Sequence, residues 1–316
     1  MLSRLSATAD TVHWGFYDAK REPVLKIRSG DVVELESVTG KPEFFSNREL
    51  QLLYHDMPNL KEIYEEVPRG PGPHILTGPI EIKGAEIGDI LAVSFNKFEP
   101  LTSIGFSLIL PLLGTLPENY PYFRARIIRL DAKRKNALFS SRIRVPLSPF
   151  FGNCGVAPPL PTGPISSMSP GVHGGNMDNK ELVAGSILYL PVHVPGGLFS
   201  VGDGHAMQGD GEVSDTALET WLGANLQFEI KKNMNIRLPM AETETHIIFM
   251  GFHADLDEAA RIAVRNTLDY LQFVKGLDRD EAYTLAGMIV DFHITQLVNG
   301  TKGVHALLRK SIFTSR

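Results

Sequence analysis

Two glycine-rich motifs in the second half of the chain carry most of the residues that could perform chemistry. Residues 173–178 read HGGNMD, and residues 202–212 read GDGHAMQGDGE. Aspartate, glutamate and histidine are the ligands that hard and borderline divalent metal ions take, and they also move protons. The surrounding glycines let the backbone approach a small ligand closely and turn through positive φ. The pattern predicts a metal-dependent hydrolytic site.

The second motif also has simpler interpretations. Gly-Asp and Asp-Gly pairs are ordinary turn signals, so the motif could form only a tight turn. A phosphate-binding loop and a dinucleotide fingerprint are excluded, because no Gly-Lys-Ser/Thr follows and residues 213–219 do not open a helix. An EF-hand is excluded by the order of the acidic residues. What survives is the pair Asp203 and His205, whose i, i+2 spacing points both side chains to one face of an extended segment.

The elements that must position these motifs are predicted to be mostly strands. Twenty-nine glycines and 21 prolines, spread along the chain, favour many short strands joined by turns. Strands are expected at residues 23–27, 30–35, 78–83, 88–95, 186–192, 216–231 and 243–252, and the first two are expected to pair across a turn. Helices are expected at residues 257–275 and 278–300, the second opened by an Asp-led capping box. The fold class is mainly β with a helical α+β C-terminal portion.

The strands expected at residues 78–83 and 88–95 repeat a feature of those expected at 23–27 and 30–35. Gly30-Asp31 opens one strand and Gly88-Asp89 opens another, each followed by alternating apolar residues. These two occurrences suggest an internal structural repeat.

Composition excludes several classes of function. The 316 residues are 43% apolar and 21% charged, as in an ordinary soluble globular protein. A net charge of −5 gives no electrostatic case for nucleic acid or an anionic membrane as partner. The single Cys154 excludes an intramolecular disulfide, and no apolar run reads as a signal peptide or transmembrane span, so a cytoplasmic protein is expected. The chain divides into an N-terminal β-rich part, 1–145, and a motif-bearing part, 146–316, expected to form one compact unit.

Three residues outside the two motifs are further candidates for a functional or structural role. His74 lies in a rigid Pro-Gly-Pro-His turn and is either a site residue or a solvated loop histidine; we keep it as a catalytic candidate. Cys154 could be a nucleophile, although a free cysteine is more often a small buried apolar residue. His293 is expected to be structural, beside the apolar face of the second helix.

Several long motifs in register resemble the acetamidase/formamidase family. They lie at residues 152–159, 170–178, 185–192 and 202–213, and further similarity extends to residues 76–80, 84–89 and 299–305. The match covers nearly the whole chain in the family's order. The resemblance implies a β-sandwich-rich hydrolase that cleaves the C–N bond of short linear amides to ammonia and a carboxylate. It also implies a divalent metal ion and a homo-oligomer, either a dimer or a larger assembly.

Roles follow for the residues that fall inside the matching motifs. Asp178, Asp203 and His205 are expected to hold the metal, with zinc as the first expectation and calcium also compatible. Glu212 is expected to take a proton from water and pass it to the departing nitrogen, with His173 as a further catalytic candidate.

Backbone N–H groups of Gly174, Gly175 and Gly204 are expected to stabilise the oxyanion. A compact pocket closed by Gly174, Gly175 and the rigid Pro73–His74 turn predicts preference for one- or two-carbon acyl groups.

Two alternatives stay open at this point. One is a metal-independent amidase that uses Cys154. The other is a non-catalytic β-rich binding or scaffold protein that keeps the family fold.

Overall fold

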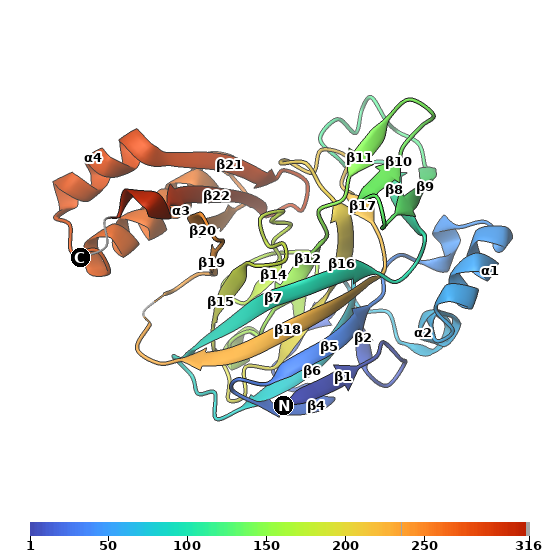
Figure 1. Cartoon of the computed structure of the whole chain (residues 1–316), viewed down its shortest axis with the longest axis horizontal. Helices are drawn as coiled ribbons and strands as arrows, with labels where there is room; N and C mark the ends of the chain where they lie inside the picture. The colour runs from blue at the N-terminus through green and yellow to red at the C-terminus, as the bar shows by residue number, and fades with distance from the viewer. Residues whose placement is uncertain (235, 314–316) are drawn as a thin grey trace.

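The computed structural model describes residues 1–234 and 236–313, and two large β-sheets make up most of it. The first sheet, nine-stranded within those ranges, has the order β1 (Leu2–Leu5), β5 (Val32–Ser37), β18 (Leu222–Lys231), β7 (Ile90–Pro100), β15 (Ile187–Pro191), β19 (Met240–Glu242), β20 (His246–His253), β22 (Lys302–Arg309) and β21 (Val290–Gln296). Strands β7 and β18 run side by side along its middle (Figure 1).

The second sheet carries the glycine-rich motifs. Its main path is β11 (Arg144–Pro146), β10 (Asn136–Leu138), β9 (Arg124–Asp131), β8 (Ile104–Ile109), β17 (Leu218–Glu219), β16 (Phe199–Met207), β12 (Phe150–Gly155) and β14 (Gly174–Asn176). Strand β6 (Ile75–Lys83) also pairs with β16, and β2 (Val12–Trp14) and β4 (Leu25–Arg28) pair with β6. A separate short pair joins β3 (Phe16–Tyr17) to β13 (Ile165–Ser166).

The main hydrophobic core lies between the two sheets. Leu35 and Val93 of the first sheet belong to one buried cluster with Phe151, Phe199 and Val201 of the second. Alternation along each strand directs one side chain in two into this layer. The architecture is therefore mainly β, and its central part is a sandwich, as predicted. Both sheets contain strands from residues 1–145 and from residues 146–316.

Helices cover the two ends of the molecule (Figure 1). At one end, α1 (Asn47–Asp56) and α2 (Leu60–Glu66) bury Leu53, Leu60 and Ile63 against two tryptophans. At the other end, α3 (Leu256–Phe273) and α4 (Arg279–Ile289) pack in the cluster that contains Phe249 and Ala306 of the first sheet. Short 3₁₀ turns occur at Pro42–Phe44, Leu160–Thr162 and Lys310–Ile312. Within the described ranges, no helix is long and apolar enough to cross a membrane.

The C-terminal helices confirm one prediction and correct another. Helix α3 lies where it was expected, and α4 opens with the predicted capping box, in which Asp278 accepts from the backbone of Glu281. The expected continuation of this helix to residue 300 is wrong, because β21 begins at Val290 and pairs with β22. Val290, Phe292, Ile294 and Thr295 are β-branched or aromatic, and sheet pairing outweighs helical periodicity there.

The predicted pairing of residues 23–27 with 30–35 is also wrong. Strand β4 pairs in parallel with β6 in the second sheet, whereas β5 pairs with β1 and β18 in the first. The chain crosses between the sheets again from β6 to β7. Each of the two similar strand pairs, β4 with β5 and β6 with β7, therefore gives one strand to each sheet. Both crossings use the same turn, in which Asp31 accepts from Arg28 N at 2.9 Å and Asp89 from Glu86 N at 2.8 Å.

Candidate active site

Strands β16 and β17 bring the central imidazole and two carboxylates together. His205 pairs directly with Glu219 in the strand register, and Asp203 precedes it by two positions. The Nε2 atom of His205 lies 3.3 Å from Asp203 Oδ2 and 3.3 Å from Glu219 Oε1. All three residues are buried. The predicted meeting of Asp203 and His205 is confirmed, and Glu219 is a member that the sequence analysis missed. Its only signal is a lone carboxylate in the run ALETWL at 217–222.

The Nδ1 atom of His205 forms a hydrogen bond with the side-chain amide of Gln208. Nδ1 lies 3.0 Å from Oε1 of Gln208, and Nε2 of Gln208 donates to the backbone oxygen of Asp178 at 2.7 Å. Because the amide presents its oxygen, His205 Nδ1 is the donor in this contact. The Nε2 atom is therefore the one turned to the carboxylates, an arrangement typical of metal-ligating histidines.

The charges at this centre are strongly interdependent. Burial opposes a charge on His205, but Glu219 and Asp203 together raise the pKa of its imidazole well above the ordinary value. Burial likewise opposes ionisation of Asp203, yet the positive charges of His205 and His74 lower its pKa overall. The centre is therefore built to hold positive charge between carboxylates.

Two further carboxyl groups approach the same imidazole from loops. Asp178 follows β14 and Glu212 follows β16, and their ligand atoms and that of His205 all lie within 4.8 Å of one another. Asn299, between β21 and β22, donates from Nδ2 to Asp178 Oδ2 at 2.5 Å. Burial and the neighbouring Asp203 raise the pKa of Asp178 to about 8. Burial, followed by Asp178, raises the pKa of Glu212 well above its usual value.

His74 also reaches this centre. Its Nε2 lies 3.7 Å from Asp203 Oδ2, and its Nδ1 lies 3.0 Å from the backbone oxygen of Ser167. Burial lowers the pKa of His74 despite the nearby carboxylate. The structure therefore places His74 beside the predicted metal ligands, not in a solvated loop.

The residues present fit a divalent metal ion. The triads Asp178–His205–Glu212 and Asp203–His205–Glu219 are each compact enough to offer three ligand atoms to one ion. Oδ1 of Asp178 is buried without a hydrogen-bond partner among the described residues. Carboxylate oxygens and an imidazole nitrogen are the donors that zinc takes in catalytic sites.

Gly152 on β12 leaves the space that this cluster needs. A Cβ atom at this position would lie 2.5 Å from Asp203 Oδ2, 2.6 Å from Asp178 Oδ1 and 2.7 Å from His205 Cε1. Asp178, Asp203 and Glu212 themselves adopt φ values of 50°, 59° and 44°, in the left-handed region that such residues rarely occupy. Local strain of this kind is concentrated at functional sites.

His173 and the three candidate oxyanion glycines do not line the cavity beside this centre, although Gly204 stands between Asp203 and His205 on β16. The His173 ring is buried 5.0 Å from the Tyr17 ring, and both its nitrogens lack partners in the described part of the chain. Gly174 and Gly175 pair with β12, and Gly204 pairs with Phe151. None of these four residues lines the cavity described below.

A cavity of about 400 Å³ opens onto the centre. His74, Asp203, Glu212 and Glu219 line its polar part, with Asn299. The apolar part is lined by Trp14, Phe44, Phe106, Leu108, Leu110 and Leu113. Of the walls predicted from the sequence, the Pro73–His74 turn lines this cavity and Gly174 and Gly175 do not. The cavity is also larger than a one- or two-carbon amide requires.

Cys154 does not line this cavity and is fully buried. Burial, with added repulsion from Asp203 and Asp178, raises the pKa of its thiol well above the usual value. A nucleophilic cysteine needs the opposite shift.

Fold and site together define a β-sandwich protein with a buried carboxylate–imidazole centre that lines a cavity. The model of the acetamidase/formamidase family matches residues 66–162 and 164–315. The chain belongs to the acetamidase/formamidase family.

Solved structures of similar proteins cover almost the whole chain. A recombinant protein of Thermoanaerobacter tengcongensis, described as a predicted acetamidase/formamidase, shares 28% identity with a TM-score of 0.86, over 99% of this chain and 97% of that one. The acetamidase of Bacillus halodurans shares 28% identity with a TM-score of 0.83, over 98% of each chain.

Among curated sequences, a Schizosaccharomyces pombe protein with a provisional formamidase name is 30% identical over 249 residues, covering 58% of this chain. That alignment spans 61% of the relative's own length.

Proposed function

We propose that this protein hydrolyses the C–N bond of linear amides such as formamide and acetamide, releasing ammonia and a carboxylate. The observation that carries the proposal is the position of His205 Nε2, 3.3 Å from each of two buried carboxylates beside a cavity. The names of the similar proteins give the substrate class.

Asp178, Asp203 and His205 are the metal ligands expected from the sequence, and we add Glu219 to them. The support is that His205 forms one compact group with Asp178 and Glu212 and another with Asp203 and Glu219. Zinc suits this mixture of carboxylate and imidazole. When bound, such an ion supplies a Lewis acid for the amide carbonyl and lowers the pKa of a water molecule.

Proton transfer falls to the carboxyl group of Glu212. It lines the cavity, and its Oε atoms can take a proton from the attacking water and return it to the amide nitrogen, which leaves as ammonia. Gln208 orients His205 through Nδ1, and Asn299 orients Asp178 through Oδ2. The amide and one water molecule give a carboxylate and ammonium, because the proton lost by the new carboxylic acid is taken up by the released ammonia, so no other reactant is needed.

The decisive experiment pairs metal analysis of the purified protein with ammonia release from formamide and acetamide. We expect Asp203→Asn and Glu219→Gln each to lower kcat/KM by about 100-fold or more while the protein stays folded. Glu244→Gln, which changes an exposed glutamate elsewhere, is the matched control. Near-wild-type turnover in both site variants would contradict the proposal.

The two alternatives give different results in the same assays. A Cys154-dependent amidase would lose turnover on thiol alkylation and keep it on chelation. A non-catalytic scaffold would release no ammonia at full metal occupancy. The homo-oligomeric assembly and the cytoplasmic location expected from the sequence stay predictions.

A further inference from the structure

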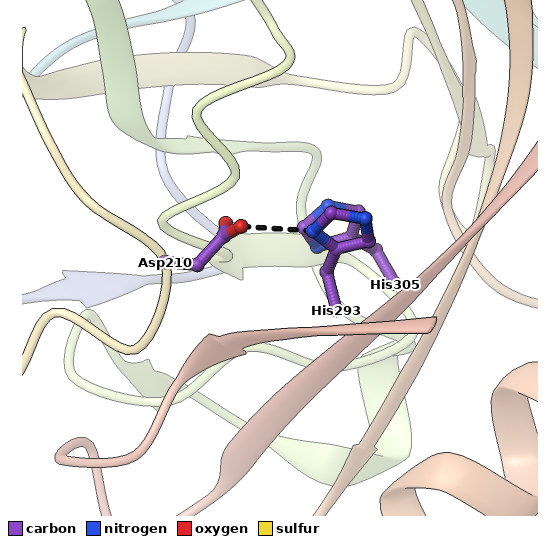
Figure 2. Close-up of side chains that lie close together, drawn as sticks. All are labelled: Asp210, His293 and His305. Atoms are coloured by element: carbon purple, nitrogen blue, oxygen red, sulfur yellow. Dashed lines mark hydrogen bonds and ion pairs between the residues drawn. The ribbon is translucent and has the colours of Figure 1, made fainter. Parts of the chain in front are cut away.

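A second group of metal-ligating side chains lies outside the active site. Asp210 comes from the loop after β16, and His293 and His305 come from the neighbouring strands β21 and β22 (Figure 2). The two histidines are direct partners in the strand register, and their rings stack at 5.1 Å with an angle of 19° between planes. One ligand atom from each of the three residues lies within 4.8 Å of the others.

His305 shows that this group is incomplete without a ligand. It is fully buried, and its Nε2 has no hydrogen-bond partner among the described residues. Its Nδ1 lies 2.8 Å from Oγ1 of Thr295, which fixes the ring. Burial lowers the pKa of His305 to about 4, so its imidazole is neutral near pH 7. A neutral, oriented imidazole with one unpartnered buried nitrogen has the chemistry of a metal ligand.

Asp210 supplies the anionic donor. Its Oδ2 lies 2.9 Å from His293 Nδ1 and 2.9 Å from Lys180 Nζ. Burial opposes its ionisation, but these two contacts lower the pKa of the carboxyl group overall. A carboxylate has two oxygens and about four lone-pair directions, so the contact with Lys180 leaves donor capacity for an ion. An ion bound at His293 Nδ1 would require the tautomer with the ring proton on Nε2.

We propose that Asp210, His293 and His305 form a second metal site that takes a borderline divalent cation of the zinc class. Two imidazole nitrogens and one carboxylate oxygen suit zinc and its first-row neighbours. Calcium and magnesium prefer all-oxygen sets and are disfavoured here. The partial exposure of Asp210 and His293 leaves a fourth position open to water.

This site would fasten the loop that carries Glu212. Gly211, between Asp210 and Glu212, already forms two backbone hydrogen bonds to the end of β21 and the residue after it, from its N to Thr295 O and from Leu297 N to its O, each 3.1 Å. The contact of Asp210 with His293 is a third link between this loop and the C-terminal strands, and an ion on Asp210 and the two histidines would extend it to His305 on β22. The site is separate from the active centre, and its existence does not depend on amide hydrolysis.

The test measures zinc and cobalt binding in the full-length chain with the active centre disabled by His205→Ala and Asp178→Asn, which together remove ligands from both of its triads. We expect one equivalent of zinc per chain in equilibrium dialysis, and a cobalt d–d absorption spectrum that zinc displaces. His293→Gln and Asp210→Asn, each added to that background, should weaken zinc binding by at least about 100-fold, because even changes to outer residues cost 10–100-fold.

His55→Gln, which changes an exposed histidine on α1, is the control and should leave zinc affinity unchanged. The proposal is overturned if the disabled background binds no zinc. It is equally overturned if His293→Gln and Asp210→Asn both keep affinity within about threefold of the control. Two independent variants are used so that misfolding of one does not decide the result. Ammonia release by the wild type is read separately and tests only the proposed function.

Discussion

Asn299 Nδ2 lies 2.5 Å from Oδ2 of Asp178, a residue 121 positions earlier in the chain. This contact joins the loop between β21 and β22 to the loop after β14. It satisfies one oxygen of Asp178 and leaves Oδ1, which has no partner in the described chain, turned to the candidate metal centre. The C-terminal segment therefore contributes to the candidate active site through Asn299, which orients the carboxylate of Asp178.

Asn299→Ala should lower kcat/KM for formamide by about 10–100-fold, because outer hydrogen bonds orient metal-ligating carboxylates. Metal affinity should fall in parallel, measured by competition with a chromogenic chelator. Asn96→Ala, which changes an amide in an exposed hydrogen bond on β7, serves as the control. Unchanged metal affinity and turnover in Asn299→Ala would show that Asp178 needs no such support.

Gly152→Ala should abolish turnover without unfolding the protein. The added methyl would lie 2.5–2.7 Å from Asp203, Asp178 and His205, so these side chains must move apart. Overpacking of this kind costs about 1–3 kcal/mol and displaces the groups that must act together. The measurements are ammonia release, metal content and thermal unfolding. Gly287→Ala, on α4 with no atom within 4 Å of the new methyl, should keep full activity.

The sequence could predict the parts of this site that depend on local spacing. Asp203 and His205 meet because alternate residues of a strand share a face. The sequence could not predict Glu219, because its meeting with His205 depends on the register between β16 and β17. Asn299 was missed because long-range packing, not spacing, brings it to Asp178.

In the fold, too, local features could be predicted from the sequence and features that depend on long-range pairing could not. The capping box of α4 was found from its residues, and a second one, Ser46 with Glu49 at the start of α1, was overlooked although its signal is present. The change from α4 to β21 was not predictable from periodicity. Pairing of Val290 through Gln296 with β22 decides the structure there.

Cys154→Ala should keep most of the activity. The thiol is buried, and both burial and the nearby carboxylates raise its pKa, so no thiolate is available near pH 7. Steady-state ammonia release, with a melting curve to verify folding, checks this. A folded variant that lost about three orders of magnitude in turnover would restore the cysteine mechanism.

His173 should make stability depend on pH between about 4 and 6.5. Burial lowers the pKa of its imidazole from 6.5 to about 4 in the folded state. Between these values the unfolded chain binds more protons, so the free energy of unfolding falls as the pH is lowered. Above this window neither state binds the proton, and below it both do, so the contribution of His173 is constant at both ends.

Urea unfolding from pH 4 to 8 measures this effect by comparing wild type with His173→Gln. Between pH 4 and 8, the free energy of unfolding should change by about 1–3 kcal/mol less in the variant than in the wild type. His13 and His305 titrate in the same direction and leave a residual slope in both proteins. His55→Gln should retain the wild-type profile. An identical profile in His173→Gln would show that this imidazole is not held neutral by burial.

The size of the acyl group should be limited less strictly than the motifs alone suggested. The cavity of about 400 Å³ is several times larger than acetamide, and the side chains of Phe44, Phe106 and Leu110 form part of its apolar wall. Each methylene that finds apolar contact contributes roughly 1–3 kcal/mol to discrimination, and only one that clashes is penalised. Propionamide and butyramide should therefore be hydrolysed with kcat/KM within about tenfold of acetamide. Ammonia release across an acyl series from formamide to hexanamide, at fixed pH and metal content, measures this directly. A fall of about 100-fold from acetamide to propionamide would show that the reacting carbonyl sits in a much narrower part of the cavity.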